Sequence, residues 1–344
     1  MNHLSFFNSV SSVLLIKLRA IGDVLLSTPV IENLKIQFPH LQIDFLCEQF
    51  AADVVRGNPY LNSILTFNKK SDSSIDLIQK VRTRHYDAVI DLFGNPRTAL
   101  VTRLSGAPHR IGFPFRGRRY AYTIHVNPRG GEVHNVDFNL DVLRKFGIPI
   151  VSQQPLFPID EQSEEFARQW IVSENLAGRE LIGINPSGGW TTKRWSIESF
   201  AQLVDEIGRD PNVSVIVFWG PGEFDDITAI RNKTSVPVHC IPKTSLKEMG
   251  ALLKQCSYLI SNDSGPMHIA ASLGVPTLGI YGPTNPILQG PYGPRNAWVR
   301  HEALDCLACN LTRCPIGNIC MKDLSVATVF TAFQQIKEKN KIAS

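Results

Sequence analysis

The sequence predicts an α/β protein built from two open, Rossmann-like parallel sheets, one in each of two domains. The chain has 344 residues, which at roughly 100–200 residues per domain corresponds to about two domains. Short β-branched runs alternate with helical patterns in both halves, as in parallel sheets joined by crossover helices. A segment with Pro149, Pro155 and Pro158 interrupts this alternation, and we place the domain boundary there, between residues 155 and 156.

Strand and helix signals define the elements of the first domain. The apolar run 12–18 is predicted to be a buried strand, followed by a turn at Gly22. A helix is predicted to start at Thr28–Pro29, because a hydroxyl and a proline are typical of a first helical turn. Further strands are predicted at 42–47, 63–67 and 87–92, and the clearest helix at 74–84.

The second domain repeats the alternation more regularly. It begins with an acidic helix start, which predicts a helix over 161–172. The strands are predicted at 181–185, 213–219, 236–240, 258–261 and 277–281, and the helices between them at 197–208, 223–231, 245–255 and 266–273. One amphipathic helix, 324–340, follows. Two parallel sheets present strand carboxyl ends and helix amino ends, so we expect ligands in a cleft between the domains.

Composition excludes several classes of protein. Hydrophobic residues make up 43% and charged residues 19% of the chain, which is ordinary for a globular protein and unlike a disordered one. The net charge of +4 is too small to predict nucleic-acid binding. Lys17 and Arg19 interrupt the most apolar stretch, and residues 1–10 lack the basic start of a secretory signal. We therefore expect a cytoplasmic protein without a membrane span.

Asp23 lies in the first loop that follows a strand. Gly22 allows a tight turn there, and a carboxylate at the end of a parallel sheet is placed to act as a base facing the ligand. Capping of the following helix is the alternative role, and the residues alone leave both open.

The loop after strand 181–185 combines hydroxyls, glycines and cations. Ser187, Thr191, Thr192 and Lys193 lie within seven residues of each other, and such a loop suits a phosphate better than it suits plain solvent exposure. The spacing differs from that of a Walker loop.

The segment Trp219–Glu223 resembles an interrupted dinucleotide fingerprint. Gly220 and Gly222 have the expected spacing, but Asp225 occupies the third glycine position. Acidic side chains there would repel a pyrophosphate, so we exclude a nicotinamide site. Glu223 is interpreted as a hydroxyl-binding residue or a helix cap.

The segment 261–271 runs from a strand end directly into a helix. Ser264 and Gly265 present backbone N–H groups at the positive end of that helix, and His268 lies one turn further along. A single histidine is commonly structural, but this one shares the turn with Asp263. We expect an anion site here, also lined by residues 281–285.

Arginines are concentrated between Leu92 and Gly131. Seven arginines occur there without a lysine or an acidic residue, which favours forked recognition of phosphate or carboxylate. Arg116, Arg118 and Arg119 lie among aromatic residues and are predicted to contact an anionic, partly apolar partner such as a phosphorylated lipid head group. A solvated surface is the alternative.

The chain has seven cysteines, and four are clustered in the segment Cys306-x2-Cys309-x4-Cys314-x5-Cys320. This spacing suits a structural zinc or iron–sulfur site, or reduced structural thiols, and the sequence leaves both open. No base lies beside the cluster in the sequence, so a catalytic role is not expected.

These segments together resemble the bacterial lipopolysaccharide heptosyltransferases, glycosyltransferase family 9. The matching blocks are 16–30, 183–189 with 193–195, 262–274, 281–284 and the cysteine segment to Met321, in the family's order. Asp263-Ser-Gly-Pro-Met-His268 is the most specific of them.

The resemblance implies a GT-B fold, with an acceptor-binding N-terminal domain (1–155) and a nucleotide-sugar-binding C-terminal domain (156–323). The last helix, 324–340, would cross back onto the N-terminal domain. It further implies an inverting transferase that requires no cofactor or catalytic metal and moves heptose from ADP-heptose to a lipopolysaccharide inner-core acceptor. Such an enzyme would work at the cytoplasmic face of the inner membrane.

The resemblance also assigns roles to residues. Asp23 would take the proton from the acceptor, and Lys193, Ser264, Gly265 and His268 would stabilise the departing ADP. Glu223 would contact the sugar or ribose, and Asp263 would orient the heptose. A nucleotide-sugar epimerase of the same fold and a catalytically silent nucleotide-sugar-binding module are the alternative functions.

Overall fold

The computed structural model describes residues 6–129 and 131–342. Residues 1–5 of the segment 1–10, which was expected not to be a secretory signal, lie outside the described part. Two compact units make up the chain, Met1–Pro158 and Ile159–Ser344, and each is described by itself. The first unit ends three residues after the boundary at residue 155 that the prolines predict. Among the described residues, no helix has both the length and the apolar character needed to cross a membrane.

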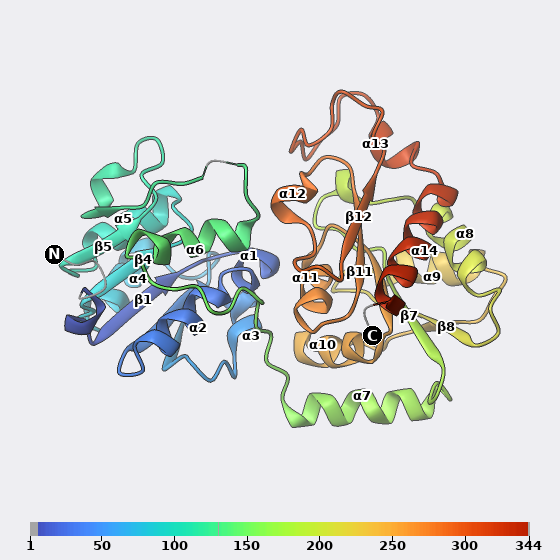
Figure 1. Ribbon diagram of the computed structural model, residues 1–344, viewed down its shortest axis with the longest axis horizontal. Coiled ribbons are helices and arrows are strands. Elements are labelled where there is room, and N and C mark those ends of the chain that lie inside the picture. Colours follow the sequence, from blue (N-terminus) through green and yellow to red (C-terminus); the bar gives the residue numbers. More distant parts are fainter. Residues whose placement is uncertain (1–5, 130, 343–344) are drawn as a thin grey trace. The chain divides into compact units, whose positions relative to one another are not determined.

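The first unit contains a parallel sheet with the strand order β3-β2-β1-β4-β5-β6 (Figure 1). Its strands are β1 (Ser12–Ile16), β2 (Gln42–Glu48), β3 (Ser63–Phe67), β4 (Ala88–Asp91), β5 (His109–Gly112) and β6 (Ile124–His125). The chain starts in the middle of the sheet, extends to one edge, and returns past β1 through β4. This is the order of a doubly wound fold, with its switch point between β1 and β4.

Helices and short 3-10 turns connect these strands. They are η2 (Phe7–Ser9), α1 (Ile21–Leu25), α2 (Thr28–Gln37), η3 (Gln49–Ala51), α3 (Ala52–Val55), α4 (Ser74–Arg82), α5 (Pro96–Leu104), η4 (Arg119–Ala121) and α6 (Asn135–Lys145). The predicted helix start at Thr28–Pro29 is confirmed, with Pro29 in the first turn of α2. The Ser73 hydroxyl accepts the N–H of Asp76 at 3.1 Å and so fixes the start of α4.

The second unit repeats the same winding in the order β12-β11-β10-β7-β8-β9. Its strands are β7 (Glu180–Asn185), β8 (Val213–Val217), β9 (Val238–Cys240), β10 (Tyr258–Asn262), β11 (Thr277–Tyr281) and β12 (Ala297–Arg300). The helices and the 3-10 turn are α7 (Glu161–Ser173), η5 (Thr191–Lys193), α8 (Ile197–Ile207), α9 (Phe224–Lys233), α10 (Leu246–Gln255), α11 (Gly265–Ser272), α12 (Pro286–Gln289), α13 (Ile319–Lys322) and α14 (Val326–Ile342). Its switch point lies between β7 and β10.

The structure confirms the predicted fold class, and it adds elements that the sequence did not indicate. Strands β5, β6 and β12 have two to four residues each and lie toward sheet edges. Strands this short carry little periodic signal, and pairing with a neighbour, such as Ile111 with Ile124, is what defines them. Helix α6 was missed because its pattern mixes polar and apolar residues, although its buried side chains include Leu140 and Leu143.

The last helix, for which the family resemblance implied a crossing onto the N-terminal domain, packs within the second unit. Helix α14 packs against α8, β11 and β12 of its own unit. Val329, Phe333 and Ile336 on one side of it are at most 2% exposed and belong to the core of the second unit. The amphipathic face therefore finds its apolar partner within the second unit.

This packing predicts that Phe333→Ala destabilises the second unit by about 3–5 kcal/mol, because a buried ring is lost and a cavity remains. The matched change Ile342→Ala on the same helix, where the side chain is 89% exposed, should cost less than about 0.5 kcal/mol. Denaturant unfolding measures both changes. Equal effects would contradict the buried position of α14.

Candidate active site

The loops at the two switch points hold most of the residues singled out from the sequence. In the first unit they are the loops after β1 and β4, and in the second unit the loops after β7 and β10. Loops that leave the carboxyl ends of adjacent parallel strands lie next to each other, and chain segments diverge there to opposite faces of the sheet. Each unit therefore has one candidate site at its own switch point.

Asp23 lies in the short helix α1, just after β1, and is half-buried. One carboxylate oxygen, Oδ2, accepts the backbone N–H of Ala20 at 3.0 Å. The helix-capping role considered from the sequence is therefore present. This hydrogen bond leaves other acceptor positions of the Asp23 carboxylate available, because an ionised carboxylate has two oxygens and about four acceptor positions.

Lys17 directly follows strand β1, ahead of this helix in the chain, and is 7% exposed. Its ammonium donates to the carbonyl of Leu92 at 3.0 Å and to Asn139 Oδ1 at 3.2 Å. Burial lowers the pKa of Lys17, and the negative charges of Asp23 and Asp91 oppose that shift. Sequence reasoning assigned no role to Lys17, although a lysine at the end of an apolar strand is a usable signal for a buried, paired cation.

Asp91 is the last residue of β4, paired with Ile16 of β1, and is fully buried. It accepts hydrogen bonds from the N–H groups of Phe93 and Gly94, at 3.0 and 2.9 Å, and from the Tyr122 hydroxyl at 2.8 Å. Burial raises the pKa of Asp91, and these hydrogen bonds oppose the rise. The cluster fixes the turn that leads into α5.

In the second unit, Lys193 and Asp263 form an ion pair. The Lys193 ammonium lies 2.7 Å from Asp263 Oδ2, and the two side chains are 15% and 5% exposed. The Thr284 hydroxyl donates to the same oxygen at 2.7 Å. The ammonium also lies 4.6 Å from the centre of the Trp190 ring. Asp263 and the Trp190 ring thus hold the Lys193 ammonium, and Thr284 in turn holds Asp263.

Backbone and amide contacts join the loops after β7 and β10. Asn185 Nδ2 donates to the hydroxyls of Ser261 and Ser264, both at 2.8 Å. Asn262 donates to the carbonyl of Pro186 at 2.7 Å and accepts the N–H of Trp195 at 3.2 Å. Ser264 precedes α11, so these contacts fix the amino end of that helix beside Lys193. The result is a positively polarised surface that suits an anion.

Glu223 is held by several partners. Its Oε2 accepts the N–H of Gly220 at 2.8 Å and a hydrogen bond from the Ser187 hydroxyl. Arg194 lies 3.5 Å from Oε1 and 3.1 Å from Asp226. Arg194 was noted from the sequence only as a cation of the loop, and its positive charge compensates the acidic residues after β8.

The remaining predicted donor residues have different surroundings. Thr191 is exposed, whereas Thr192 is 5% exposed and its hydroxyl donates to the carbonyl of Leu311 at 2.9 Å. His268 is 7% exposed within α11. Of the two threonines, Thr191 is therefore the exposed one, and it shares the turn η5 with Lys193.

The structure separates the arginines of the segment 92–131. Arg110 donates to the carbonyls of Ala107 and Ala121, and Arg129 pairs with Asp141, so these two have structural contacts. Arg116 and Arg119 are exposed, and Arg118 is half-buried. Within the described ranges, no ion pair to any of these three lies within 4.0 Å.

For the cysteine cluster the sequence left a metal site and reduced thiols both open. All seven cysteines are free thiols, and in the described part of the chain no group of three or more metal-ligating side chains is arranged to hold a metal ion. Burial raises the pKa of Cys320, which favours its thiol form. Hydrogen bonds of Ala308 and Asn310 to the carbonyls of Gly282 and Pro283 connect this segment to the loop that carries Thr284.

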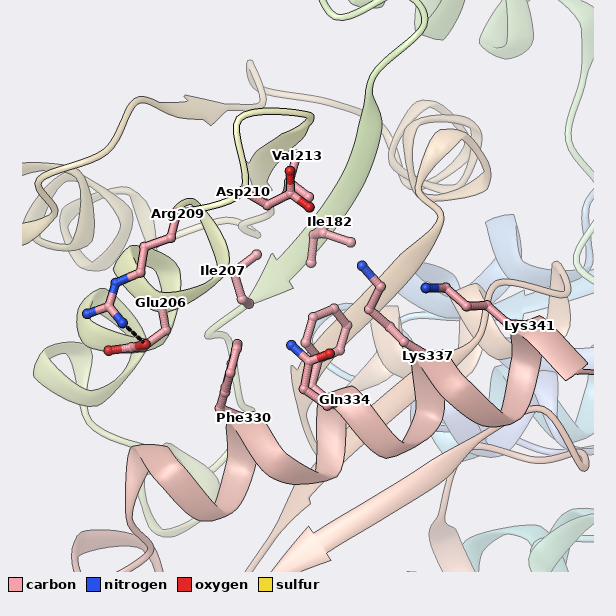
Figure 2. A pocket seen from close by; sticks show the side chains of 11 residues that line it. Ile182, Glu206, Ile207, Arg209, Asp210, Val213, Phe330, Gln334, Lys337 and Lys341 are labelled. Carbon is pink, nitrogen blue, oxygen red and sulfur yellow. Dashed lines mark hydrogen bonds and ion pairs between the residues drawn. The ribbon is translucent and has the colours of Figure 1, made fainter.

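A cavity of about 510 Å³ lies at the opposite end of the second sheet, between α8, α14 and the starts of β7 and β8 (Figure 2). Lys337 and Lys341 extend into it from one side of α14. The Lys337 ammonium is already bound to Glu180 at 2.9 Å. This cavity is remote from the strand carboxyl ends, and it contains none of the predicted site residues.

Comparisons with known proteins agree with this arrangement. The family model for glycosyltransferase family 9 (heptosyltransferase) matches residues 74–320. Lipopolysaccharide heptosyltransferase 3 of Escherichia coli is 28% identical over 288 residues, which covers 79% of this chain and 83% of that protein.

Two solved structures show the fold. A family 9 glycosyltransferase from Veillonella parvula has a TM-score of 0.82 at 27% identity, covering 95% of this chain and 97% of that one. An Escherichia coli heptosyltransferase solved with ADP has a TM-score of 0.73 at 20% identity, covering 94% and 99%.

The cluster around Asp91 predicts a pH-dependent effect of Tyr122→Phe. A carboxyl whose folded pKa is raised above its ordinary value of 3.8 stabilises the fold below that value, and the stability is lost as pH rises through the folded pKa. The Tyr122 hydroxyl limits this loss. Tyr122→Phe should therefore cost about 1.5–3 kcal/mol near pH 7 and clearly less near pH 4. Denaturant unfolding at both pH values measures it, and Tyr120→Phe, on a 57% exposed ring, is the control. An equal cost at both pH values would refute the coupling.

Proposed function

Since the chain belongs to glycosyltransferase family 9 (heptosyltransferase), we propose that it transfers heptose from ADP-heptose to an inner-core sugar of lipopolysaccharide, with inversion and without a catalytic metal. The family membership makes the chain a glycosyltransferase of the lipopolysaccharide heptosyltransferase family. The single observation that supports the mechanism is that the two switch points hold different chemical groups. One holds a half-buried carboxylate, and the other a fixed ammonium beside a helix amino end.

In this proposal Asp23 is the general base. Its carboxylate accepts the proton of the acceptor hydroxyl as that oxygen bonds to the anomeric carbon of the heptose. The bond from the anomeric carbon to the ADP oxygen breaks on the opposite side, so the configuration inverts. The capping bond from Ala20 supports this role, because it fixes the orientation of the carboxylate.

The departing ADP carries the negative charge that develops in the reaction. The Lys193 ammonium and the N–H groups at Ser264 and Gly265 are placed to neutralise it, and the Thr191 hydroxyl and His268 lie on the same elements. Preorganised donors of this kind stabilise a leaving anion without reorganising during the reaction. They supply the charge stabilisation that a metal ion would otherwise provide, which supports the metal-independent assignment.

Three acidic or hydroxyl groups are assigned to the sugar and the ribose. Asp263 anchors Lys193 and orients the heptose, while Glu223 and Ser187 lie where they can contact hydroxyls of the nucleotide sugar. The assignment of ADP as the nucleotide is supported by the Escherichia coli heptosyltransferase of the same fold that was solved with ADP.

The acceptor is assigned to the first unit. The acceptor side includes three arginines that follow the carboxyl end of β5, at the same end of the sheet as Asp23, namely Arg116, Arg118 and Arg119. Their forked cations suit the phosphates of an anionic glycolipid. Such an acceptor is carried by a membrane, so we place the enzyme in the cytoplasm at the surface of the inner membrane. Nucleic acid is not an expected partner.

Family membership favours transfer over the two alternatives. A nucleotide-sugar epimerase would alter the donor sugar without an acceptor, and a silent binding module would bind ADP-heptose without turnover. Product analysis in the absence and presence of acceptor distinguishes the three functions, because only a transferase releases ADP in an acceptor-dependent manner.

Replacement of the proposed base should separate chemistry from binding. Asp23→Asn is expected to lower acceptor-dependent ADP release by about 10²–10⁴-fold in a buffer containing EDTA, since general-base catalysis is worth about that much. The dissociation constant of ADP-heptose, measured by calorimetry, should change less than about twofold, because Asp23 lies in the other unit from the donor site.

Asp76→Asn is the matched control. Asp76 also accepts a backbone N–H at a helix start, from Ser73 at 3.2 Å, but it lies on α4 away from the switch point. Its replacement should leave ADP release unchanged. Wild-type turnover by Asp23→Asn would refute the mechanism.

Neutralisation of Arg116, Arg118 and Arg119 by glutamine should raise the apparent KM for the acceptor at least about tenfold and weaken its salt dependence, because charge-assisted contacts to phosphate are lost. Donor affinity should stay the same. A triple glutamine variant of Arg168, Arg209 and Arg231 in the second unit removes equal charge elsewhere. Equal acceptor kinetics in the two variants would return the three arginines to a solvated surface.

A further inference from the structure

Helix α5 presents an unusual exposed face. Leu100 and Leu104 are 39% and 40% exposed, and the exposed Arg103 lies between them at helical spacing i, i+3, i+4. The opposite face is buried through Ala99, Val101 and Thr102. A solvent-facing helix side is normally polar, so two leucines beside an arginine make this side amphipathic.

The turn η4 lies beside this helix. Ala99 of α5 and Ala121 of η4 are fully buried in one small apolar cluster, which fixes the two elements side by side. On η4, Arg119 is exposed and Tyr120 is 57% exposed, and Arg116 is exposed in the loop before it. We call Leu100, Arg103, Leu104, Arg116, Arg119 and Tyr120 the α5–η4 face.

The charge on this face has one sign. The sequence from Leu92 to Gly131 contains no acidic residue, and the three arginines of the face form no ion pair within 4.0 Å in the ranges that the structure describes. A membrane interface accommodates leucine, tyrosine and arginine together, with the basic side chains at the head groups. The charge is complementary to anionic phospholipid head groups, which add about 1 kcal/mol of attraction per basic residue near the surface.

The face is continuous with the acceptor side of the first sheet. Helix α5 follows the carboxyl end of β4, and the loop with Arg116 follows the carboxyl end of β5. Both strands run parallel to β1, so these segments start from the same carboxyl end of the sheet at which Asp23 lies. An acceptor anchored in the bilayer beneath this face would therefore meet the same edge.

We propose that the α5–η4 face docks the first unit on an anionic lipid bilayer. Leu100, Leu104 and Tyr120 enter the head-group region, and the arginines contact lipid phosphates. The role of this docking, which is to bring a membrane-anchored acceptor to Asp23, rests on the proposed function. The identification of the bilayer rests on the composition and charge of the face itself.

The test uses a variant with Leu100→Gln, Arg103→Gln and Leu104→Gln in the full chain. Glutamine is a good helix former, so α5 should persist. Co-sedimentation with vesicles of phosphatidylglycerol and phosphatidylcholine should show wild-type binding that declines with salt and is absent with phosphatidylcholine alone. The variant should bind at least about 25-fold more weakly, with about fivefold from the arginine alone.

A matched variant carries Val172→Gln, Arg231→Gln and Ile342→Gln, which removes two exposed apolar side chains and one arginine from the second unit. It should bind vesicles as the wild type does. Equal binding by the two variants would overturn the proposal, as would wild-type binding that does not require anionic lipid. If the α5 variant fails to fold, Leu100→Gln against Val172→Gln decides the same question.

Turnover separates this proposal from the enzymatic one. With a delipidated, water-soluble core oligosaccharide as acceptor, the α5 variant should release ADP at the wild-type rate, and with acceptor embedded in the vesicles it should lose at least about tenfold. Vesicle binding by a wild-type protein that releases no ADP with either acceptor would overturn the proposed function and leave the docking intact. Equal losses with both acceptors would show that α5 serves the reaction and not docking.

Discussion

The reversal of chain direction at the middle of each parallel sheet is the constraint on which the structure depends. Because each sheet is doubly wound, the loops after its two central strands diverge to opposite faces and leave a site between them. In the first unit this position collects Lys17, Asp23 and Asp91, and in the second it collects Asn185, Lys193 and Asp263. Residues separated by about 70 positions along the chain therefore meet without any need for a long structured loop.

Charges at both sites are removed from water and compensated locally. Asp91 accepts three hydrogen bonds, Lys17 donates to two oxygens, and Lys193 is paired with Asp263. An unpaired charge in such surroundings would cost several kcal/mol, so each of these groups fixes its neighbours as well as being fixed by them. In the proposed reaction the same arrangement would leave the donors in place before the charge of the leaving diphosphate develops.

The small net charge of +4 conceals an uneven distribution. Arginines of the first unit divide into those bound by backbone carbonyls or aspartates, such as Arg110 and Arg129, and those left facing solvent around α5 and η4. Exposed leucines and a tyrosine among the latter arginines turn a plain basic surface into an amphipathic one. This amphipathic surface follows strands β4 and β5, whereas Asp23 follows the neighbouring strand β1.

The sequence by itself determined the fold class, most strand and helix positions, and the loops that form the candidate site, because period, glycine turns and helix starts are local signals. Asp23, Lys193 and Asp263 were predicted as site residues in this way, and an anion site was predicted at the turn of Ser264. Tertiary structure alone decided the partners: Tyr122 on Asp91, Thr284 on Asp263 and Arg194 on Glu223, each joined across strands by pairing that no local pattern encodes. It also assigned α14 to the second unit and left the clustered cysteines without metal geometry in the described residues, since burial of an apolar face and the meeting of thiols depend on distant segments.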